Sequence, residues 1–276
     1  MVTISVVICT RGRPDALADA VGDALAQLGP DDDLCVIDQS DQPTLPSTDP
    51  RLRYVVDPGR GLPRARNLGV ELTRGDVVWF LDDDVRLRPG CLEAHRRAYA
   101  DPWVGGVTGR IDEVIVRPNS RRLRNGIGLG GRVRTRLDGD RPAPLETLKG
   151  ANMSMRRAAL RSAGPCDEGL RGTALLEDAE WSTRVAALGW RLRFEPAAAV
   201  VHLSLPAGGC RVADPLATER WRFHNTARFI RRHRPHQRLR VTATFALIAA
   251  RRAWQWRDPG AVGALMRAWR EGWSGG

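Results

Sequence analysis

The sequence predicts an α/β protein in which helices flank a mainly parallel sheet, followed by a C-terminal helical extension. Short apolar runs alternate with helix-like segments through the first half of the chain, which is typical of strand–helix–strand units in a doubly wound sheet. Several of these runs carry no charge, as expected for strands covered by helices on both faces. The chain has 276 residues, of which 42% are apolar, so it is long enough to bury such a core.

Local signals define the elements of the first half in order. Ile4–Cys9 is an uncharged apolar run and predicts the opening strand. Pro14 and Pro89 each open a helix, because the fixed φ of proline suits the first helical turn, and Gly75 ends a third helix. The predicted helices are Pro14 to about Leu28, Leu62–Leu72 and Pro89 to about Tyr99, and the remaining strands are Leu34–Asp38, Leu52–Asp57, Val77–Leu81 and Val104–Thr108.

Aspartates stand where three of these strands end. Asp38, Asp57 and Asp82 each follow an apolar run, and Asp83 and Asp84 extend the last of them. A single aspartate at a strand end commonly caps the next turn, but this edge of an open α/β sheet is also where ligands bind. Adjacent carboxylates repel one another, and oxygen ligands favour Mg²⁺ or Mn²⁺ shared with a phosphate. The strand ends therefore predict a divalent-cation site.

The second half contributes a long irregular segment, an acidic helix start and a histidine. Arg117–Pro144 is rich in glycine, arginine and proline, and we expect a functional loop that lies over the site as a lid. Glu177 and Asp178 open a helix that Gly189 ends; the helix dipole alone would favour acidic residues there. His202 follows an apolar run and is placed to ligate a metal. The other elements are a strand leading into a helix over Gly150–Arg157, a turn at Gly164–Glu168, and strands Arg191–Phe194 and Ala197–Val201.

The net charge of +11 arises from arginine, since Lys149 is the only lysine. A basic chain can bind nucleic acid, an anionic membrane or a phosphorylated substrate. No zinc-finger or aromatic RNA-binding signature accompanies the arginines, so we expect no nucleic-acid partner. Five widely spaced cysteines favour a reducing compartment, and the N-terminus, which enters a strand directly, does not resemble a signal peptide. These features predict a cytoplasmic protein.

The order of the motifs resembles glycosyltransferase family 2, enzymes of the GT-A fold whose Rossmann-like sheet binds a nucleoside-diphosphate sugar. The resemblance extends from about Ser5 to His202. Cys9 stands where the family often has proline, and Gln39 stands where aspartate or asparagine is commoner. The matching segments are Val6–Pro14, Val36–Ser40, Gly61–Asn67, Phe80–Asp84, Gly150–Met153, and Glu177-Asp178 with Arg184, Gly189 and His202.

The resemblance implies a role for each motif. Asp84 would bind a Mn²⁺ or Mg²⁺ ion that bridges the two phosphates of the donor, with Asp82 and His202 as further ligands. Asp178 would be the general base that deprotonates the acceptor hydroxyl, with Glu177 as the competing candidate. Family members that resemble this chain typically invert the anomeric centre. The residues expected to hold the nucleotide are Thr10, Arg11, Arg13, Asp38, Arg66, Asn67, Asp82 and Asp83.

The resemblance ends at about His202. We therefore expect a catalytic domain over residues 1–205 and a basic, tryptophan-rich helical extension over residues 206–276. Its predicted helices are Arg220–His233, Val241–Trp256 and Pro259–Trp273.

The extension and the acceptor each have two interpretations. The helices could brace the sheet, or they could dock on the inner face of a membrane to reach a lipid-linked acceptor; a soluble small molecule or natural product is the alternative acceptor. Two further functions stay open: a sugar nucleotidyltransferase, although the loop after the first strand has one glycine and no lysine, and a protein that binds sugar nucleotides without catalysis. The residues expected at the membrane headgroups are Arg251, Arg252, Trp254 and Trp256.

Overall fold

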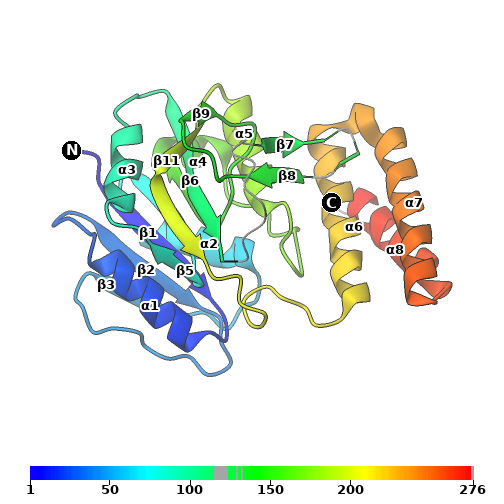
Figure 1. Ribbon diagram of the computed structural model, residues 1–276, viewed down its shortest axis with the longest axis horizontal. Helices are drawn as coiled ribbons and strands as arrows, with labels where there is room; N and C mark the ends of the chain where they lie inside the picture. Colours follow the sequence, from blue (N-terminus) through cyan, green and yellow to red (C-terminus); the bar gives the residue numbers. More distant parts are fainter. Residues whose placement is uncertain (115–123, 129, 132, 275–276) are drawn as a thin grey trace.

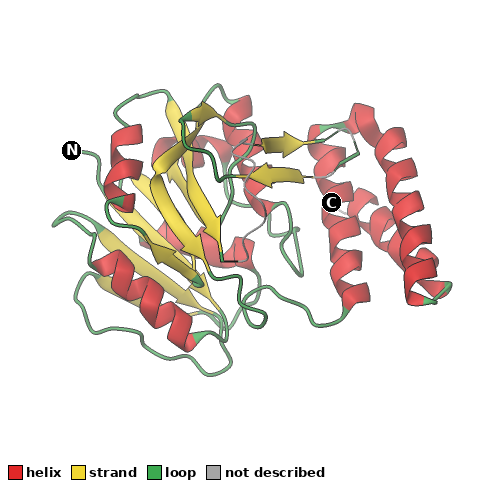
Figure 2. Cartoon of the chain, viewed as in Figure 1, coloured by secondary structure: helices red, strands yellow, loops and turns green. Residues whose placement is uncertain are grey.

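The computed structural model describes residues 1–114, 124–128, 130–131 and 133–274. A central sheet carries helices on both faces, and three long helices form a group at one end of the molecule (Figure 1, Figure 2). The strands lie in the order β3-β2-β1-β4-β10-β6-β11-β5, with β9 paired to β11. Their bounds are β1 Ile4–Thr10, β2 Asp33–Asp38, β3 Leu52–Val56, β4 Val77–Asp82, β5 Val85–Leu87, β6 Val104–Glu113, β9 Ala143–Pro144, β10 Asn152–Arg156 and β11 Arg191–His202.

Side chains of the central strands alternate between two apolar cores. In β1, Ile4, Val6 and Ile8 belong to the core under helices α1 and α3, whereas Val7 belongs to the core under α2, α4 and α5. Because both faces of β1 and β4 are covered, a charged side chain on either face would be buried, and the strands are accordingly uncharged up to Asp82, the last residue of β4. The helices are α1 Pro14–Leu25, α2 Leu62–Leu72, α3 Cys91–Ala98, α4 Arg157–Ala163 and α5 Glu177–Ala187.

The sheet is mixed rather than parallel throughout. Strands β3, β2, β1 and β4 run parallel, as predicted, but β10 lies antiparallel to both β4 and β6. Strand β5, which the sequence pattern did not predict, pairs antiparallel with β11. The prediction of a mainly parallel, Rossmann-like sheet flanked by helices is confirmed, and the antiparallel pairings of β10 and β5 add to it beyond β4. A buried strand has the same apolar pattern in either direction, so the sequence pattern carries no information on its orientation.

Two strands that the sequence predicts separately form a single strand in the structure. Arg191–Phe194 and Ala197–Val201 form the single strand β11, with a register shift against β6 between Glu195 and Val200. Pro196 lies within this irregularity, where a missing backbone donor is tolerated. Helix α3 begins at Cys91 rather than at Pro89, because Gly90 has a left-handed backbone conformation with φ of 75°.

The segment Arg117–Pro144 was wrongly predicted to be free of strands. Its residues 117–123 lie outside the described part, but β7 (Arg124–Ile127) and β8 (Val133–Arg136) form an antiparallel hairpin. This hairpin lies against the C-terminal helices (Figure 1): Ile127 joins their core, and Arg234 donates a hydrogen bond of 3.1 Å to the Ile127 carbonyl. The described part of the segment thus bridges the sheet to the helices. The expectation of a lid over the site stays a prediction, because residues 117–123, 129 and 132 of the segment lie outside the described part.

The C-terminal helices surround a third apolar core. They are α6 Pro215–His233, α7 Arg238–Trp256 and α8 Gly260–Ser274. Phe245 lies at the centre of this core, with ring centroids 4.7 Å from Phe223 and 4.9 Å from Trp269. The core also includes Leu176 and Ala179 from the region of α5, so residues from both sides of the domain boundary predicted at 205 share it; the boundary stays a prediction. Among the described residues, no helix combines the length and apolarity needed to cross a membrane.

Ion pairs fix α6 to the start of the acidic helix α5. The buried carboxylate of Glu180 on α5 lies 3.1 Å from His233 and 3.2 Å from Arg232 on α6. One helical turn away, Arg228 pairs with Asp167 at 2.7 Å. Because α5 also begins with Glu177 and Asp178, the C-terminal helices help to hold those two carboxylates in position.

A buried histidine predicts acid sensitivity of the fold. The His95 side chain is fully buried; its Nε2 lies 2.8 Å from Asn152 Oδ1 and its Nδ1 lies 2.8 Å from Ser154 Oγ. Burial lowers the pKa of His95 from 6.5 to about 4, and the Asn152 hydrogen bond opposes this only in part. Between these pH values the unfolded chain therefore binds a proton at His95, whereas the folded chain does not. The contribution of the neutral His95 to the free energy of unfolding is complete above pH 6.5 and is lost as the pH falls toward 4.

We expect the free energy of unfolding to fall by about 3 kcal/mol from this group over that range, at about 1.4 kcal/mol per pKa unit. Urea unfolding at several pH values would measure it, with His95→Gln losing this part of the slope. His236, which is exposed, provides the matched control, since His236→Gln should keep the full slope. An unchanged slope in His95→Gln would contradict the assignment.

Candidate active site

The parallel strands bring their C-terminal residues to one edge of the sheet. Thr10 is opposite Asp38 in the register of β1 with β2, and Cys9 is opposite Asp82 in the register of β1 with β4. The polar side chains that follow these strands therefore meet above the sheet edge, as expected for an open α/β sheet.

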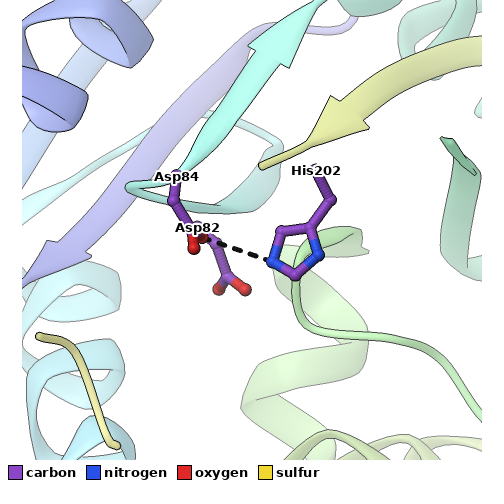
Figure 3. Close-up of side chains that lie close together, drawn as sticks. All are labelled: Asp82, Asp84 and His202. Atoms are coloured by element: carbon purple, nitrogen blue, oxygen red, sulfur yellow. Dashed lines mark ion pairs between the residues drawn. The ribbon is translucent and has the colours of Figure 1, made fainter. Parts of the chain in front are cut away.

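Asp82, Asp84 and His202 converge at this edge (Figure 3). One ligand atom from each lies within 4.8 Å of those of the other two, and Asp84 Oδ1 is 3.3 Å from His202 Nε2. A hard divalent cation lies about 2.1–2.6 Å from its oxygen ligands, so two ligands of one ion are up to about 5 Å apart. Two carboxylates and an imidazole at this spacing fit Mn²⁺ or Mg²⁺.

Neighbouring groups keep the Asp84 carboxylate ionised, as cation binding requires. Burial works against its ionised form, but the contacts with His202, Arg13 and the Leu205 backbone N–H outweigh burial and lower the pKa of Asp84. For His202, burial lowers the pKa and the Asp84 carboxylate raises it, with a net increase. Asp82 is the accessible member of the trio, with 34% of its side chain exposed.

Asp83 and Arg13, both predicted to hold the nucleotide, mainly contact other protein groups. Asp83 accepts hydrogen bonds of 2.7 Å from Thr10 Oγ1 and from Arg13 Nη1. Burial nevertheless raises the pKa of Asp83 to about 6. Arg13 also pairs with Asp84 at 3.1 Å and donates to the Ala207 carbonyl at 2.7 Å. Arg13 thus connects the turn at Asp83 and Asp84 to the segment after β11.

A cavity of about 380 Å³ opens beside this turn, over the ends of β1 and β2. Thr10 and Arg11, both predicted to hold the nucleotide, line it together with Gln39. Its wall is strongly basic, which suits an anionic ligand such as a nucleoside diphosphate. The arginines that line it are Arg11, Arg60, Arg64, Arg171 and Arg211.

Two other predicted nucleotide contacts are engaged inside the protein. Asp38 accepts hydrogen bonds from the Tyr54 hydroxyl at 2.6 Å and from the Ser40 N–H at 2.8 Å. Asn67 accepts from the Cys166 N–H at 2.7 Å and donates to Glu168 at 2.9 Å. These contacts hold β2 to β3 and α2 to the turn at residues 164–168.

A second cavity, of about 220 Å³, contains the acidic start of α5. Asp82, Glu177 and Asp178 line it with two cations, Arg66 and Lys149. The buried Arg66 forms an ion pair with Glu177 and lies 3.8 Å from Asp82, while Lys149 Nζ lies 3.3 Å from Asp178 Oδ2. The fold therefore brings together predicted residues from α2, β4 and α5 that are far apart in the sequence.

The pKa values of the two neighbouring carboxylates of α5 are shifted in opposite directions. Burial raises the pKa of Glu177 to about 8, although Arg66 opposes it. Burial would also raise the pKa of Asp178, but the Lys149 ammonium and the Gly150 N–H more than compensate and lower it. Asp178 is thus ionised, and able to accept a proton, at neutral pH.

Lys149, Gln39 and Cys210 are among the cavity-lining residues that the sequence did not predict for the site. Lys149 was recognised only as the single lysine, and Gln39 only as a departure from a family motif. Cys210, which lines both cavities, follows a strand in an irregular segment, and no pattern in the sequence distinguishes it.

Comparisons with known proteins identify the family of this chain. The model of glycosyl transferase family 2 matches residues 5–164 of the chain. The pre-mycofactocin glycosyltransferase of Mycobacterium tuberculosis (strain H37Rv) is 32% identical over 147 residues, which cover 52% of this chain and 30% of that protein. The match therefore spans less than a third of the length of that relative.

Two solved structures share the fold. The structure of GalNAc-T7 with UDP, GalNAc and Mn²⁺ has a TM-score of 0.62 at 16% identity and covers 84% of this chain and 51% of its own. The mannosyltransferase from Pyrobaculum calidifontis in complex with GDP-Man and Mn²⁺ has a TM-score of 0.59 at 16% identity and covers 99% of this chain and 75% of its own. At such identities the likeness concerns the fold, which is GT-A.

Proposed function

The chain belongs to glycosyl transferase family 2, and from this premise we propose that it transfers a sugar from a nucleoside-diphosphate sugar to a hydroxyl group of an acceptor. The observation that carries the proposal is the position of the Asp82–Asp84–His202 trio beside two cavities. The basic cavity suits the nucleotide of the donor, and the acidic cavity suits the acceptor hydroxyl. Donor sugar, base and acceptor are not specified by these features.

A divalent cation is part of the proposal. Asp84 and His202 would hold it, with Asp82 at the accessible side. When bound, the ion would neutralise the charge that develops on the departing nucleoside diphosphate. Both solved structures described above contain Mn²⁺ with a nucleotide or a sugar nucleotide, which supports a cation of this kind.

We assign the general base to Asp178. It is ionised, lines the second cavity and lies one residue from Glu177, whose carboxylate is engaged by Arg66. A hydroxyl in this cavity that gives its proton to Asp178 would attack the sugar from the side opposite the diphosphate, and the anomeric centre would invert. Arg66, which pairs with Glu177 and lies 3.8 Å from Asp82, would reduce the repulsion between these two carboxylates.

A panel of nucleotides tests the function. Thermal unfolding would be followed with UDP, GDP, ADP, CDP and dTDP, each with and without Mn²⁺, because a ligand that binds only the folded protein raises its apparent stability. We expect one nucleoside diphosphate to stabilise the protein strongly, and only with the cation. The corresponding sugar nucleotide would then be tested for release of the nucleoside diphosphate. No stabilisation by any of the five nucleotides would count against the proposal.

We further propose that α7 docks on an anionic lipid surface, which would suit a lipid-linked acceptor. Three large apolar side chains on α7 are strongly exposed: Leu239 by 84%, Leu247 by 74% and Trp254 by 80%. At 100° per residue they fall within about 80° of arc on the helix, so they share one face. The exposed Arg240 and Arg251 border one edge of that face, about 100° and 120° around the helix from Leu239, which makes this edge complementary to acidic headgroups.

The four residues expected at the membrane headgroups do not all lie on the exposed side of α7. Arg251 and Trp254 lie on the exposed side of α7. Arg252 instead pairs with Glu219 on α6 at 2.9 Å, and its guanidinium lies 5.8 Å from the Trp256 ring centre. Arg252 and Trp256 therefore belong to the contact between helices.

We expect the protein to float with liposomes that contain anionic lipid, and to detach as salt rises, since each basic residue contributes about 1 kcal/mol before screening. The triple variant Leu239→Ser, Leu247→Ser, Trp254→Ser should bind several-fold more weakly. Trp103 and Leu188, exposed by 63% and 53% away from α7, provide the control pair, whose serine variants should bind normally. No flotation even at low salt would leave the helices as braces and favour a soluble acceptor, and a dimer by size-exclusion chromatography would indicate a second copy on this face.

A further inference from the structure

The lining of the second cavity contains more carboxylates than cations. Asp82, Glu177 and Asp178 line it together, and like charges at close range favour protonation of one of them. Arg66 contacts Glu177 and Asp82. In the described part of the chain, Lys149 is the cation in contact with the third carboxylate, Asp178, at 3.3 Å.

The backbone around Lys149 is held firmly, although its side chain is half exposed. The Lys149 N–H donates to Thr108 Oγ1 at 2.9 Å, and the Lys149 carbonyl accepts from the Asn152 N–H at 3.2 Å. The next residue, Gly150, donates its N–H to Asp178 Oδ2 at 3.0 Å. The turn before β10 thus presents an ammonium and an amide to the same carboxylate oxygen.

Burial distinguishes this ion pair from a surface pair. Only 10% of the Asp178 side chain is exposed, against 47% for Lys149. A surface pair contributes little because water screens it, but the charge state of a buried carboxylate depends on its nearest cation.

The identity of the residue is informative as well, because Lys149 is the only lysine among the 43 lysine and arginine residues of the chain. A planar guanidinium tends to occupy both oxygens of a carboxylate, whereas an ammonium is a point charge that can contact one. At Asp178 a lysine leaves Oδ1 with capacity for an acceptor hydroxyl, since among the described residues this oxygen accepts only the Ala179 N–H, at 2.8 Å.

We infer that Lys149 is a positioning residue for the base: it holds Asp178 ionised and fixes one of its oxygens while the other can receive the acceptor proton. This rests on the proposed function, because it takes Asp178 as the base. The charged groups around Asp178 are Lys149 before β10, Arg66 on α2, Glu177 on α5 and Asp82 on β4. Loss of the Lys149 charge leaves Arg66 to balance three carboxylates.

The first test reads the ion pair without any substrate. Because Lys149 is the only lysine, trace acetylation by acetic anhydride followed by peptide mass spectrometry reports the reactivity of its amine alone, apart from the N-terminus. Asp178 raises the pKa of Lys149, so at pH 9 the amine of Asp178→Asn should react faster, by about tenfold for each unit of pKa lost. Glu177→Gln, the adjacent carboxylate paired with Arg66, should give a smaller increase. Equal reactivity in wild type and Asp178→Asn would overturn the inference.

The second test reads the consequence for the base. Hydrolysis of the sugar nucleotide selected by the thermal-shift panel, with water as acceptor, would be measured against pH for Lys149→Met and Lys149→Arg. The base acts when ionised, so removing the ammonium should move the acid limb of kcat/KM to higher pH, and Lys149→Arg should move it back. A merely structural role would lower kcat/KM at every pH and leave the limb in place, and that result would also overturn the inference. If no sugar nucleotide is hydrolysed by wild type, the proposed function fails, while the labelling still reports the ion pair.

Discussion

Replacing Asp178 by asparagine is expected to lower turnover by about 10²–10⁴-fold, the usual contribution of a general base. Asparagine keeps the shape of the side chain and its hydrogen bond from the Gly150 N–H, but it cannot take a proton. Affinity for the nucleoside diphosphate should change little, because Asp178 lines the second cavity and the nucleotide is assigned to the first. Steady-state turnover and the thermal shift with nucleotide and Mn²⁺ would measure the two quantities separately.

Glu177→Gln is the matched control, and it should lower turnover less. The pH profile provides an independent reading of which carboxylate is the base. The lowered pKa of Asp178 places the acid limb of kcat/KM below neutral pH, since the rate falls only when the base becomes protonated. If Glu177 were the base, the limb would lie near its pKa of about 8. A limb there, together with a severe defect in Glu177→Gln, would mean that the two roles are reversed.

Asp84→Ala is expected to remove the stabilisation by nucleoside diphosphate that depends on Mn²⁺ or Mg²⁺. Turnover should fall about 10²-fold or more, because neutralising the charge on a leaving diphosphate contributes several kcal/mol to the transition state. The variant should stay folded, because Asp84 lies in the turn after β4 and Arg13 keeps its contact with Asp83. Circular dichroism and thermal unfolding without ligand would verify this.

Asp112→Ala is the control for this variant. Asp112 is a carboxylate at the end of β6 that contacts Arg110 at 2.7 Å and lies outside the trio with His202. Its loss should leave the metal-dependent thermal shift intact. Full turnover of the wild type in excess chelator would contradict the metal site outright.

The sequence determined the elements whose local pattern has a single interpretation. The uncharged runs of β1 and β4 predicted strands covered on both faces, and both lie between two apolar cores. The helix start at Glu177 and the strand ends at Asp38 and Asp82 also agree with the structure. These features depend on the chemistry of residues close in the chain, which the sequence contains in full.

Tertiary structure alone decided which chemical groups meet. The antiparallel entry of β10 between β4 and β6 places Lys149 beside Asp178, and no local pattern encodes the direction of a buried strand. The ion pair of Arg66 with Glu177 likewise joins α2 to α5, and Asp38 turns to Tyr54 rather than to solvent. Charge states follow from burial and from such neighbours, so the sequence could propose the carboxylates of the site, whereas the distinction between Glu177 and Asp178 came from their packing.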